Sequence, residues 1–390
     1  MKQYYIRIGD NNDSLDNIID FLAKIFGPNY YDAKRIQASI IKHEPSTMAQ
    51  NFIIARSLQD ELIGMVRIVE RQMRLGTAIL SCGGISSVSI HPDWRRQGIM
   101  PEIMNAAHKR MTQCDMDISF LHGRRAMDGY YTQLGYYGIN RYIDLEIISS
   151  IVGEDNLQVF PFSQQNISTI ANLYNDTYAS LSGSVVRDEK IWAFLIARMN
   201  ETDKQTKLLE CHFKESSEMI GYLIISGDKM IELSLPHVFF PYLPSAIKKL
   251  GLNYISIHPH HPFYTYARSN FSTLQQERFT LDGGYMGKIL NPFSLLSKIY
   301  PDLFLRATGI GVSDKRIQIF GCEVELLSGT ISKATGPDDI ILERKEDSIR
   351  ILLGMHHLDD YSGVYLNPDK PWLRYLFPST GFHTSAFDEI

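Results

Sequence analysis

Hydrophobic and polar positions in roughly the first 150 residues alternate between the period of strands and the period of helices. Short apolar runs such as YYIRI and NFIIARS, and the longer run ELIGMVRIVERQM, predict strands. Two amphipathic runs, Leu15 to Phe26 and Tyr31 to His43, have the spacing of helices. A Gly83-Gly84 pair then precedes a further predicted strand, Ile85 to Ile90. This part of the chain therefore mixes α and β elements.

The period changes again at Gly98. Apolar residues then recur three and four positions apart, which predicts a helix with one apolar face, formed by Met100, Ile103, Met104, Ala107 and Met111. Pro101 suits the first turn of such a helix. The segment Asp117 to Leu121 follows as a predicted buried strand.

Two further mixed regions follow along the chain. The middle region starts with LQVFPF and has a helical pattern around Ile167 to Tyr178. Its segment ISIHPHHPFYTYARSNF faintly repeats ISFLHGRRAMDGYYTQLGYYG, which suggests a duplication without a copy of the turn Arg95 to Gly98. From about Leu290, one helical run (SLLSKIYPDLFLRA) and three strand-like runs (RIQIFGCEVELL, DDIILERK and SIRILLG) predict a third, α+β domain.

Length and charge limit the classes of function. A chain of 390 residues exceeds the size at which one core stops growing, so two or three domains are expected. The net charge of -5 gives no overall basic field, which argues against nucleic acid or an anionic membrane as partner. We find no secretory h-region and no run of about 18 apolar residues, and therefore expect a cytoplasmic protein.

Cysteine and histidine patterns do not indicate a metal centre. The four cysteines are far apart and lack CxxC spacing, so reduced thiols are expected. The tract HPHHP, with His258, His260 and His261, has no cysteine or carboxylate at ligand spacing. His122, after the DISFL strand, could line a site or act as a base through water, but packing is the more common role of a lone histidine there.

The segment Val88 to Met104 carries the clearest chemistry. A strand ends, a turn with Arg95, Arg96 and Gly98 follows, and a helix starts. The first N–H groups of a helix have no partner within it, and the helix dipole adds positive charge, so this is an anion site. Glycine allows a phosphate to approach the backbone, and the arginines add charged donors. The alternative is an ordinary turn with solvated arginines.

The run V-x-I-H-P-D-W-R-R-Q-G-I resembles the acetyl-CoA motif, R/Q-x-x-G-x-G/A, of the GNAT N-acetyltransferase superfamily. Arg95 and Gly98 match its first two fixed positions, and Met100 stands where glycine or alanine is usual. The resemblance implies acetyl-CoA as co-substrate, without a metal. The implied contacts are Val88, Ser89, Ile90, Arg95, Arg96, Gln97, Gly98, Ile99 and Met100.

A second motif lies beyond the next strand. The run Tyr130 to Tyr136, YYTQLGY, is similar to the GNAT pattern F-Y-x-x-x-G-F/Y. By this resemblance Tyr131 protonates the departing thiolate, and a phenol whose ordinary pKa is near 10 suits that role. The alternative is a core aromatic. Direct transfer also needs an N–H from the strand Val88 to Ile90 to meet the developing oxyanion, and a base that the residues alone do not place.

Over its full length the chain resembles the enhanced intracellular survival (Eis) branch of this superfamily. The implied domains are a catalytic GNAT domain (1-148), a degenerate GNAT-like domain (149-289) and a sterol-carrier-protein-like α+β domain (290-390), giving a mixed α+β fold. In that branch the terminal carboxylate is the base, which here implies Ile390, with the side chains of Asp388 and Glu389 as competitors. The branch forms homo-oligomers, namely hexamers, and acetylates amines.

Two functions from different classes therefore remain at this stage. The first is an acetyl-CoA-dependent N-acetyltransferase that acts on a primary amine of an aminoglycoside, a polyamine or a lysine-like acceptor. The second is a non-catalytic CoA- or lipid-binding regulatory protein on the same scaffold, because a fold does not establish a function. The enzyme requires Tyr131 and a base, whereas the binding protein requires only the phosphate turn.

Overall fold

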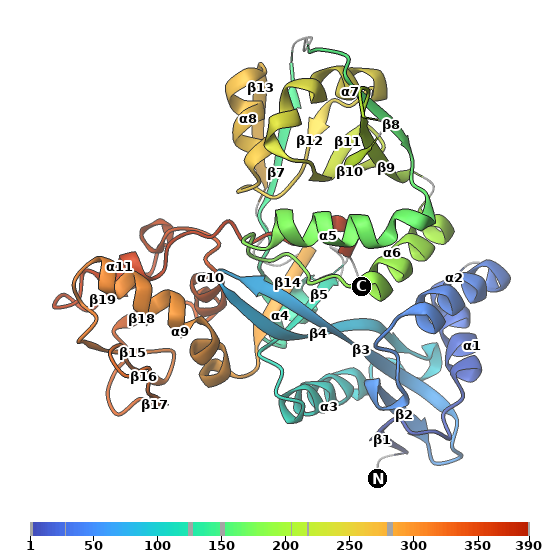
Figure 1. Ribbon diagram of the computed structural model, residues 1–390. Coiled ribbons are helices and arrows are strands. Elements are labelled where there is room, and N and C mark those ends of the chain that lie inside the picture. The colour runs from blue at the N-terminus through green and yellow to red at the C-terminus, as the bar shows by residue number, and fades with distance from the viewer. Residues whose placement is uncertain are drawn as a thin grey trace.

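The computed structural model describes residues 3–27, 29–123, 128–148, 153–203, 205–216, 218–278 and 284–388. Two seven-stranded sheets form two parts of the molecule, and helices with two small sheets form a third (Figure 1). This confirms the predicted mixed α+β class.

The first sheet has the strand order β1-β2-β3-β4-β5-β14-β6, in which only β4 and β5 pair in parallel. Side chains alternate between its faces. Phe52, Ile54 and Met65 pack with the first two helices, and Ile53 and Val66 pack with α3 on the opposite face. The elements are β1 Tyr4–Ile8, α1 Leu15–Phe26, α2 Tyr30–His43, β2 Phe52–Ser57, β3 Leu62–Leu75, β4 Ala78–Ile90, α3 Ile99–Gln113, β5 Ile118–Gly123, α4 Asp128–Gln133, β6 Tyr137–Gly138 and β14 Gly284–Ile289.

Strand β4 is longer than the predicted Ile85 to Ile90. It includes Gly83, where a Cβ atom would lie 2.1 Å from the sulfur of Met111 and 2.8 Å from that of Met116. A glycine inside a strand often marks such a close approach rather than the end of the strand. Gly83 therefore lets α3 and the residues after it pack closely on the sheet.

The second sheet repeats this order, as β8-β9-β10-β11-β12-β7-β13, and again has one parallel pair, β11 with β12. Helices α5 and α6 lie between the two sheets (Figure 1). The elements are β7 Tyr142–Ile147, β8 Leu157–Pro161, α5 Ile167–Tyr178, α6 Glu189–Thr202, β9 Thr206–Phe213, β10 Met219–Ser226, β11 Lys229–Ser234, α7 Leu243–Leu250, β12 Tyr254–Ile255, α8 Pro262–Asn270 and β13 Thr273–Arg278.

Each large sheet contains one strand from the other predicted domain. Strand β14, from the predicted second domain, pairs with β5 from Gly284↔Gly123 to Ile289↔Ile118, and its orange ribbon lies among the strands of the first sheet (Figure 1). Strand β7, from the predicted first domain, pairs with β12 and β13. The sheets therefore interlock across positions 148 and 289, which are the predicted domain boundaries.

The C-terminal part packs against the first sheet through helix α9. Leu295, Leu296 and Leu303 of this helix share a core with Leu80 of β4 and Ile118 of β5. Its two small sheets have the orders β15-β16-β17 and β18-β19. The elements are α9 Pro292–Gly309, β15 Arg316–Ile319, β16 Cys322–Glu325, β17 Ile331–Lys333, β18 Ile340–Leu342, α10 Asp347–Leu353, β19 Val364–Leu366 and α11 Leu373–Leu376.

The prediction of a strand for SIRILLG was wrong, because these residues belong to helix α10 and its cap. Short apolar runs fit both periods, so pattern alone does not separate them. Here an ion pair three residues apart, Arg350 Nη1 to Asp347 Oδ1 at 3.1 Å, supports the helical spacing. Gly354 ends the helix with a left-handed φ of 67°.

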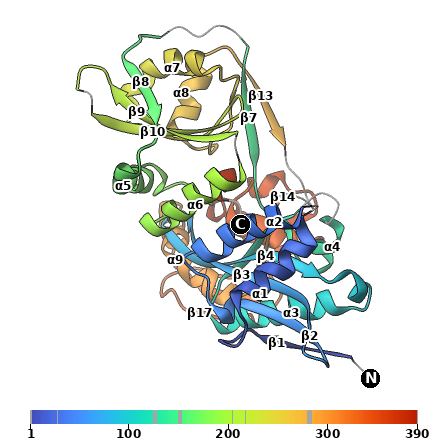
Figure 2. The same cartoon turned by 90° about the vertical axis from the view of Figure 1, so that its right-hand side faces the viewer.

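After α11 the chain returns to lie between the two large sheets, beside α6 (Figure 2). The backbone N–H of His383 donates to the Ser182 carbonyl (3.0 Å), and that of Thr384 donates to the Asn140 side chain (2.7 Å). Residues 382–388 are called the tail below. Among the described residues, none of the helices has the length and apolar character needed to cross a membrane.

Candidate functional site

Strands β4 and β5 separate part-way along their length. They pair only from Cys82↔Ile118 to Gly84↔Phe120, although β4 continues to Ile90. On the other side of β4, the register with β3 shifts so that Ser87 and Val88 face the single residue Val66. Ser87 has a left-handed φ of 53° at this bulge. The second half of β4 thus has an edge that β5 does not cover.

The predicted phosphate turn directly follows this edge. Gly98 has φ 76° and precedes α3, and a Cβ atom there would meet nothing within 4 Å. Arg95, Arg96 and Gln97 are all exposed. Arg95 Nε makes a long bond to the Ile90 carbonyl at the end of β4 (3.3 Å). Gln97 Nε2 makes another to the Asp93 carbonyl in the 3₁₀ turn Pro92–Trp94 (3.4 Å). The space beside Gly98 and the first N–H groups of α3 therefore suit a phosphate.

Met100, which departs from the family motif, packs against the apolar cluster under α3. The same cluster contains Ile99, Val88 and Ile90. A larger side chain at this position is thus accommodated by the core rather than directed at the turn. The structure brings the predicted contact residues of β4 and α3 together around one cluster.

Tyr131 belongs to that cluster as well. It lies on α4, is 8% exposed, and packs with Ile85 of β4 and Leu121 of β5. Its ring meets Tyr130 at a centroid distance of 5.4 Å and Tyr136 at 6.3 Å. Burial raises the pKa of Tyr131 above its ordinary value, because burial penalises the phenolate. The phenol is therefore protonated at neutral pH.

A chain of buried polar side chains, not foreseen from the sequence, holds these elements together. Tyr136 Oη lies 2.7 Å from Ser119 Oγ and 2.8 Å from His108 Nε2. Lys288 Nζ lies 3.3 Å from His108 Nδ1 and donates to the Leu134 carbonyl (2.8 Å). Burial, with the nearby Lys288 charge, lowers the pKa of His108 to about 4, so its ring is neutral. The network links α3, β5, β14 and the turn after α4.

Three arginines gather where β3 faces α2 and α6, and we call Arg67, Arg71 and Arg198 the arginine face. Arg71 forms a buried bidentate ion pair with Glu44, with Nη1 2.8 Å from Oε1 and Nη2 2.6 Å from Oε2. Arg67 Nη2 lies 3.4 Å from Ser86 Oγ, one residue before the bulge. Alternating arginines within an apolar strand (MVRIVER) were a sequence sign of this face, because Arg67 and Arg71 lie on the same side of β3.

The tail ends in a buried ion-pair network. The Arg187 guanidinium is fully buried and donates to both Asp388 (2.8 and 2.7 Å) and Glu232 (2.7 and 2.8 Å). Arg198 Nη2 donates to the Phe387 carbonyl at 2.6 Å. The Asp388 carboxylate is thus engaged in fixing the tail. Glu389 and Ile390, the other two candidates for a base, lie outside the described residues.

The histidines considered at first have structural partners. His258 Nε2 contacts the Ser182 carbonyl (2.9 Å), and His261 Nε2 contacts the Leu233 carbonyl (3.0 Å). The His122 ring lies beside that of Tyr285, with the ring centroids 5.1 Å apart and the planes tilted by 56°. In the part of the chain that the structure describes, no group of three or more His, Cys, Asp or Glu side chains could hold a metal ion.

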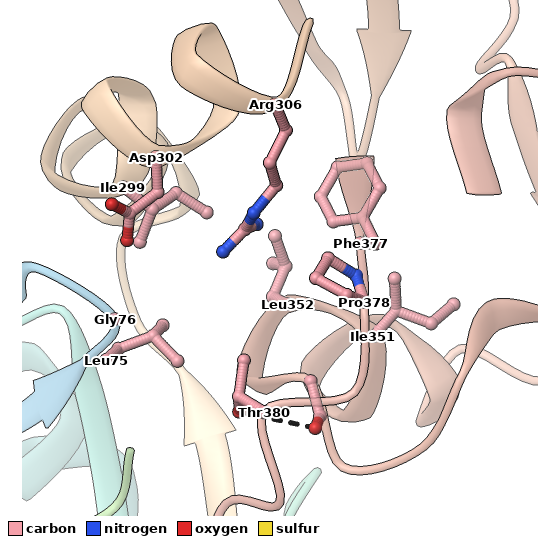
Figure 3. A pocket seen from close by; sticks show the side chains of 11 residues that line it. Leu75, Gly76, Ile299, Asp302, Arg306, Ile351, Leu352, Phe377, Pro378 and Thr380 are labelled. Atoms are coloured by element: carbon pink, nitrogen blue, oxygen red, sulfur yellow. Dashed lines mark hydrogen bonds between the residues drawn. The ribbon is translucent and has the colours of Figure 1, made fainter. Parts of the chain in front are cut away.

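A hollow of about 310 Å³ lies elsewhere, between the β3–β4 turn and the C-terminal part. Figure 3 shows Asp302 and Arg306 of α9 on one side of it, opposite Leu75 and Gly76. Asp302 accepts bonds from the backbone and hydroxyl of Thr77, at 2.9 and 2.7 Å. The hollow contains none of the predicted site residues and lies at an interface between two parts of the chain.

Residues 10–139 match the acetyltransferase (GNAT) domain family. This segment is therefore similar to GNAT domains. It contains β4, the phosphate turn, α3 and Tyr131, which are the features that the two motifs had indicated. No curated protein sequence matches the chain.

Solved structures share the fold over the whole chain at low identity. A probable N-acyltransferase of unknown function from Enterococcus faecalis V583 is 14% identical, with 97% of each chain covered and a TM-score of 0.68. Eis1 from Mycobacterium abscessus is 12% identical, covering 99% of this chain and 100% of its own, with a TM-score of 0.64. A GCN5-related N-acetyltransferase from Kribbella flavida is 14% identical, with 100% and 99% covered and a TM-score of 0.64. The Eis-type fold that the sequence predicted is therefore confirmed.

Proposed function

We propose that the GNAT domain transfers an acetyl group from acetyl-CoA directly to a primary amine. The observation that carries this proposal is the uncovered edge of β4, which leads into the Gly98 turn and shares one cluster with Tyr131. An extended thioester needs these three features in this order: an edge with free backbone groups, an anion site, and an acid.

The residues present fit the co-substrate. The open space at Gly98 and the first N–H groups of α3 suit the pyrophosphate, and Arg95 and Arg96 would add charged donors. Val88, Ser89 and Ile90 would line the acyl end along β4, and Gln97, Ile99 and Met100 would complete the turn. Acetyl-CoA supplies an acetyl group that is activated as a thioester.

Tyr131 is the proposed acid. Its raised pKa keeps the phenol protonated, so that Oη can give its proton to the sulfur as the C–S bond breaks and the new C–N bond forms. A backbone N–H from the bulged segment Val88 to Ile90 can donate to the carbonyl oxygen as negative charge develops there. Outside the β3–β4 ladder, no described residue bonds to the Val88 backbone, which leaves it available for this role.

The proposed base is the terminal carboxylate of Ile390, which takes the proton that the amine loses. Arg187 and Arg198 fix Asp388 and Phe387, and two more residues extend a chain by at most about 7 Å. Arg198 is close enough to act electrostatically on Arg67, which lies 3.4 Å from Ser86 at the bulge. The tail is thus held on the side of β3 and β4 from which an amine would approach.

The test is CoA release from acetyl-CoA with aminoglycosides, polyamines, amino acids and lysine peptides. We expect turnover with at least one amine, and a loss of turnover in Tyr131→Phe and in a chain extended beyond Ile390. Binding of acetyl-CoA should survive in both variants, as measured by calorimetry. A wild-type protein that binds acetyl-CoA but acetylates no amine would instead be a CoA-binding protein.

A further inference from the structure

Arg67 is a buried cation that forms no ion pair with any residue that the structure describes. Its side chain is 1% exposed, yet its two hydrogen bonds are long, to the Ile40 carbonyl and to Ser86 Oγ, both at 3.4 Å. Its Nε atom is buried and has no partner among the described residues. An unpaired charge in a protein interior is costly, so a group of this kind calls for an explanation.

The surrounding charges do not neutralise it. Glu44 is the anion that acts on Arg67, but both of its oxygens are bonded to Arg71. Arg71 and Arg198 add two further positive charges. Burial and these neighbours lower the pKa of Arg67 to about 10, so it is still charged at neutral pH. Among the described residues, Arg67 therefore has no carboxylate bonded to it.

The position of Arg67 makes this charge relevant to the reaction. It contacts Ser86, one residue before the bulge, on the face opposite α3. Ser86 and Ser87 are partly exposed, although Gly84 and Ile85 just before them are buried. A small ligand that reaches the uncovered edge of β4 from this side would meet the guanidinium.

We infer that Arg67 binds a carboxylate of the acceptor, so that the amine is amino-acid-like, with a carboxylate a few bonds from the amino group. This inference rests on the proposed function. A planar guanidinium suits a carboxylate because it can offer two parallel N–H donors, and Nε is one that lacks a partner here. Polyamines and aminoglycosides carry only positive charge and offer no acceptor of this kind to the Arg67 guanidinium.

The test uses acceptors in matched sets: amino acids, their amides and the corresponding decarboxylated amines. We expect kcat/KM to be about tenfold to a hundredfold higher for the carboxylate member, as for a hydrogen bond to a charged group. Arg67→Met should bring this ratio close to one, while Arg67→Lys should keep part of it. A wild-type preference for the decarboxylated amine, or a ratio that Arg67→Met does not change, would overturn the inference.

The melting temperature of Arg67→Met gives a second, independent measurement. Replacing an unpaired buried cation by an apolar side chain should leave the melting temperature equal or higher in the absence of ligand. Arg56→Met is the matched control, because Arg56 lies on the neighbouring strand β2 and is paired with Asp13 at 2.8 Å. We expect that variant to lose stability and to keep the acceptor ratio. A fall in melting temperature with Arg67→Met would count against an unpaired charge.

The chain's own last carboxylate is a second source of the same chemistry. If Arg67 served only that group, Arg67→Met and a chain shortened to residue 388 would reduce turnover equally for charged and uncharged acceptors, which would overturn the inference. Failure of the proposed function gives a different result, because no amine is then acetylated. In that case thermal shift with N-acetyl amino acids decides: stabilisation of the wild type but not of Arg67→Met supports a carboxylate site, and equal shifts reject it.

Discussion

The two large sheets have the same strand order but differ after their parallel strands separate. In the first sheet, β4 leads into a left-handed Gly98 and then α3. In the second, β11 is followed by a 3₁₀ helix, His237–Tyr242, and α7 starts after Tyr242 with an ordinary φ of -92°. The second copy thus has no glycine at the start of its helix. The same topology therefore has a left-handed glycine turn before the helix in one sheet and a 3₁₀ helix in the other.

The backbone beyond the parallel pair differs as well. In the second sheet Tyr178 Oη bonds to both the N–H (3.3 Å) and the carbonyl (3.2 Å) of Leu233, and His261 also reaches that carbonyl. In the first sheet the Val88 backbone has no such side-chain partner among the described residues. Under the proposed function, the reaction takes place at the sheet whose β4 backbone is left open. In the second sheet, side chains bond to the backbone of β11 instead.

The largest expected effect is on kcat. It should differ between Tyr131 of α4 and Tyr264 of α8, two tyrosines that occupy matching positions. Tyr131→Phe should lower kcat by about a hundredfold to ten-thousandfold, as for loss of a general acid. Tyr264→Phe should leave kcat unchanged and stability equal or slightly higher, since its buried hydroxyl has no described partner. Steady-state kinetics and thermal unfolding would check both. If the two substitutions lowered kcat equally, Tyr131 would have no catalytic role that Tyr264 lacks.

A smaller effect is expected from releasing the tail that lies between the sheets. Asp388→Asn removes one partner of the fully buried Arg187 and should cost on the order of 3 kcal/mol in the free energy of unfolding. Glu277→Gln, at the half-buried pair with Arg141, should cost less than about 1 kcal/mol. Denaturant unfolding measures both. If Asp388→Asn also keeps full turnover, the tail does not supply the base.

The phosphate turn is tested by two left-handed glycines with open surroundings. Gly98→Ala and Gly251→Ala should each cost about 1 kcal/mol of stability, because both have positive φ and neither Cβ meets an atom within 4 Å. Only Gly98→Ala should raise the KM for acetyl-CoA, by roughly tenfold, since its Cβ would enter the phosphate site. An equal KM in the two variants would remove the turn from the binding site.

The smallest effect concerns pH. A general acid works in its protonated form, and a raised pKa keeps Tyr131 protonated to higher pH. The rate should therefore rise or stay level from neutral pH toward about pH 10, as the acceptor amine loses its proton. A decline of kcat between pH 7 and 9 in the wild type, absent from Tyr131→Phe, would show that the phenol ionises too early for this role.

Much of the candidate site was predictable because its parts are local. The helix starting at Ile99, the glycine of the turn and the aromatic run around Tyr131 are adjacent in sequence, and each has its own pattern. SIRILLG failed because a short apolar run does not separate a helix from a strand. Arg67 was not singled out, although its place in an apolar strand was visible, because its partners come from α2, β4 and α6.

The sequence by itself determined the local elements, the glycine turn before α3 and the order of the three parts, because periodicity and glycine conformation act over a few residues. Only the tertiary structure decided the exchange of β7 and β14, the His108–Tyr136–Lys288 network and the burial of Asp388 against Arg187. These contacts join segments up to 201 residues apart. Such pairings arise from packing and charge between distant segments, which leave no local pattern to follow.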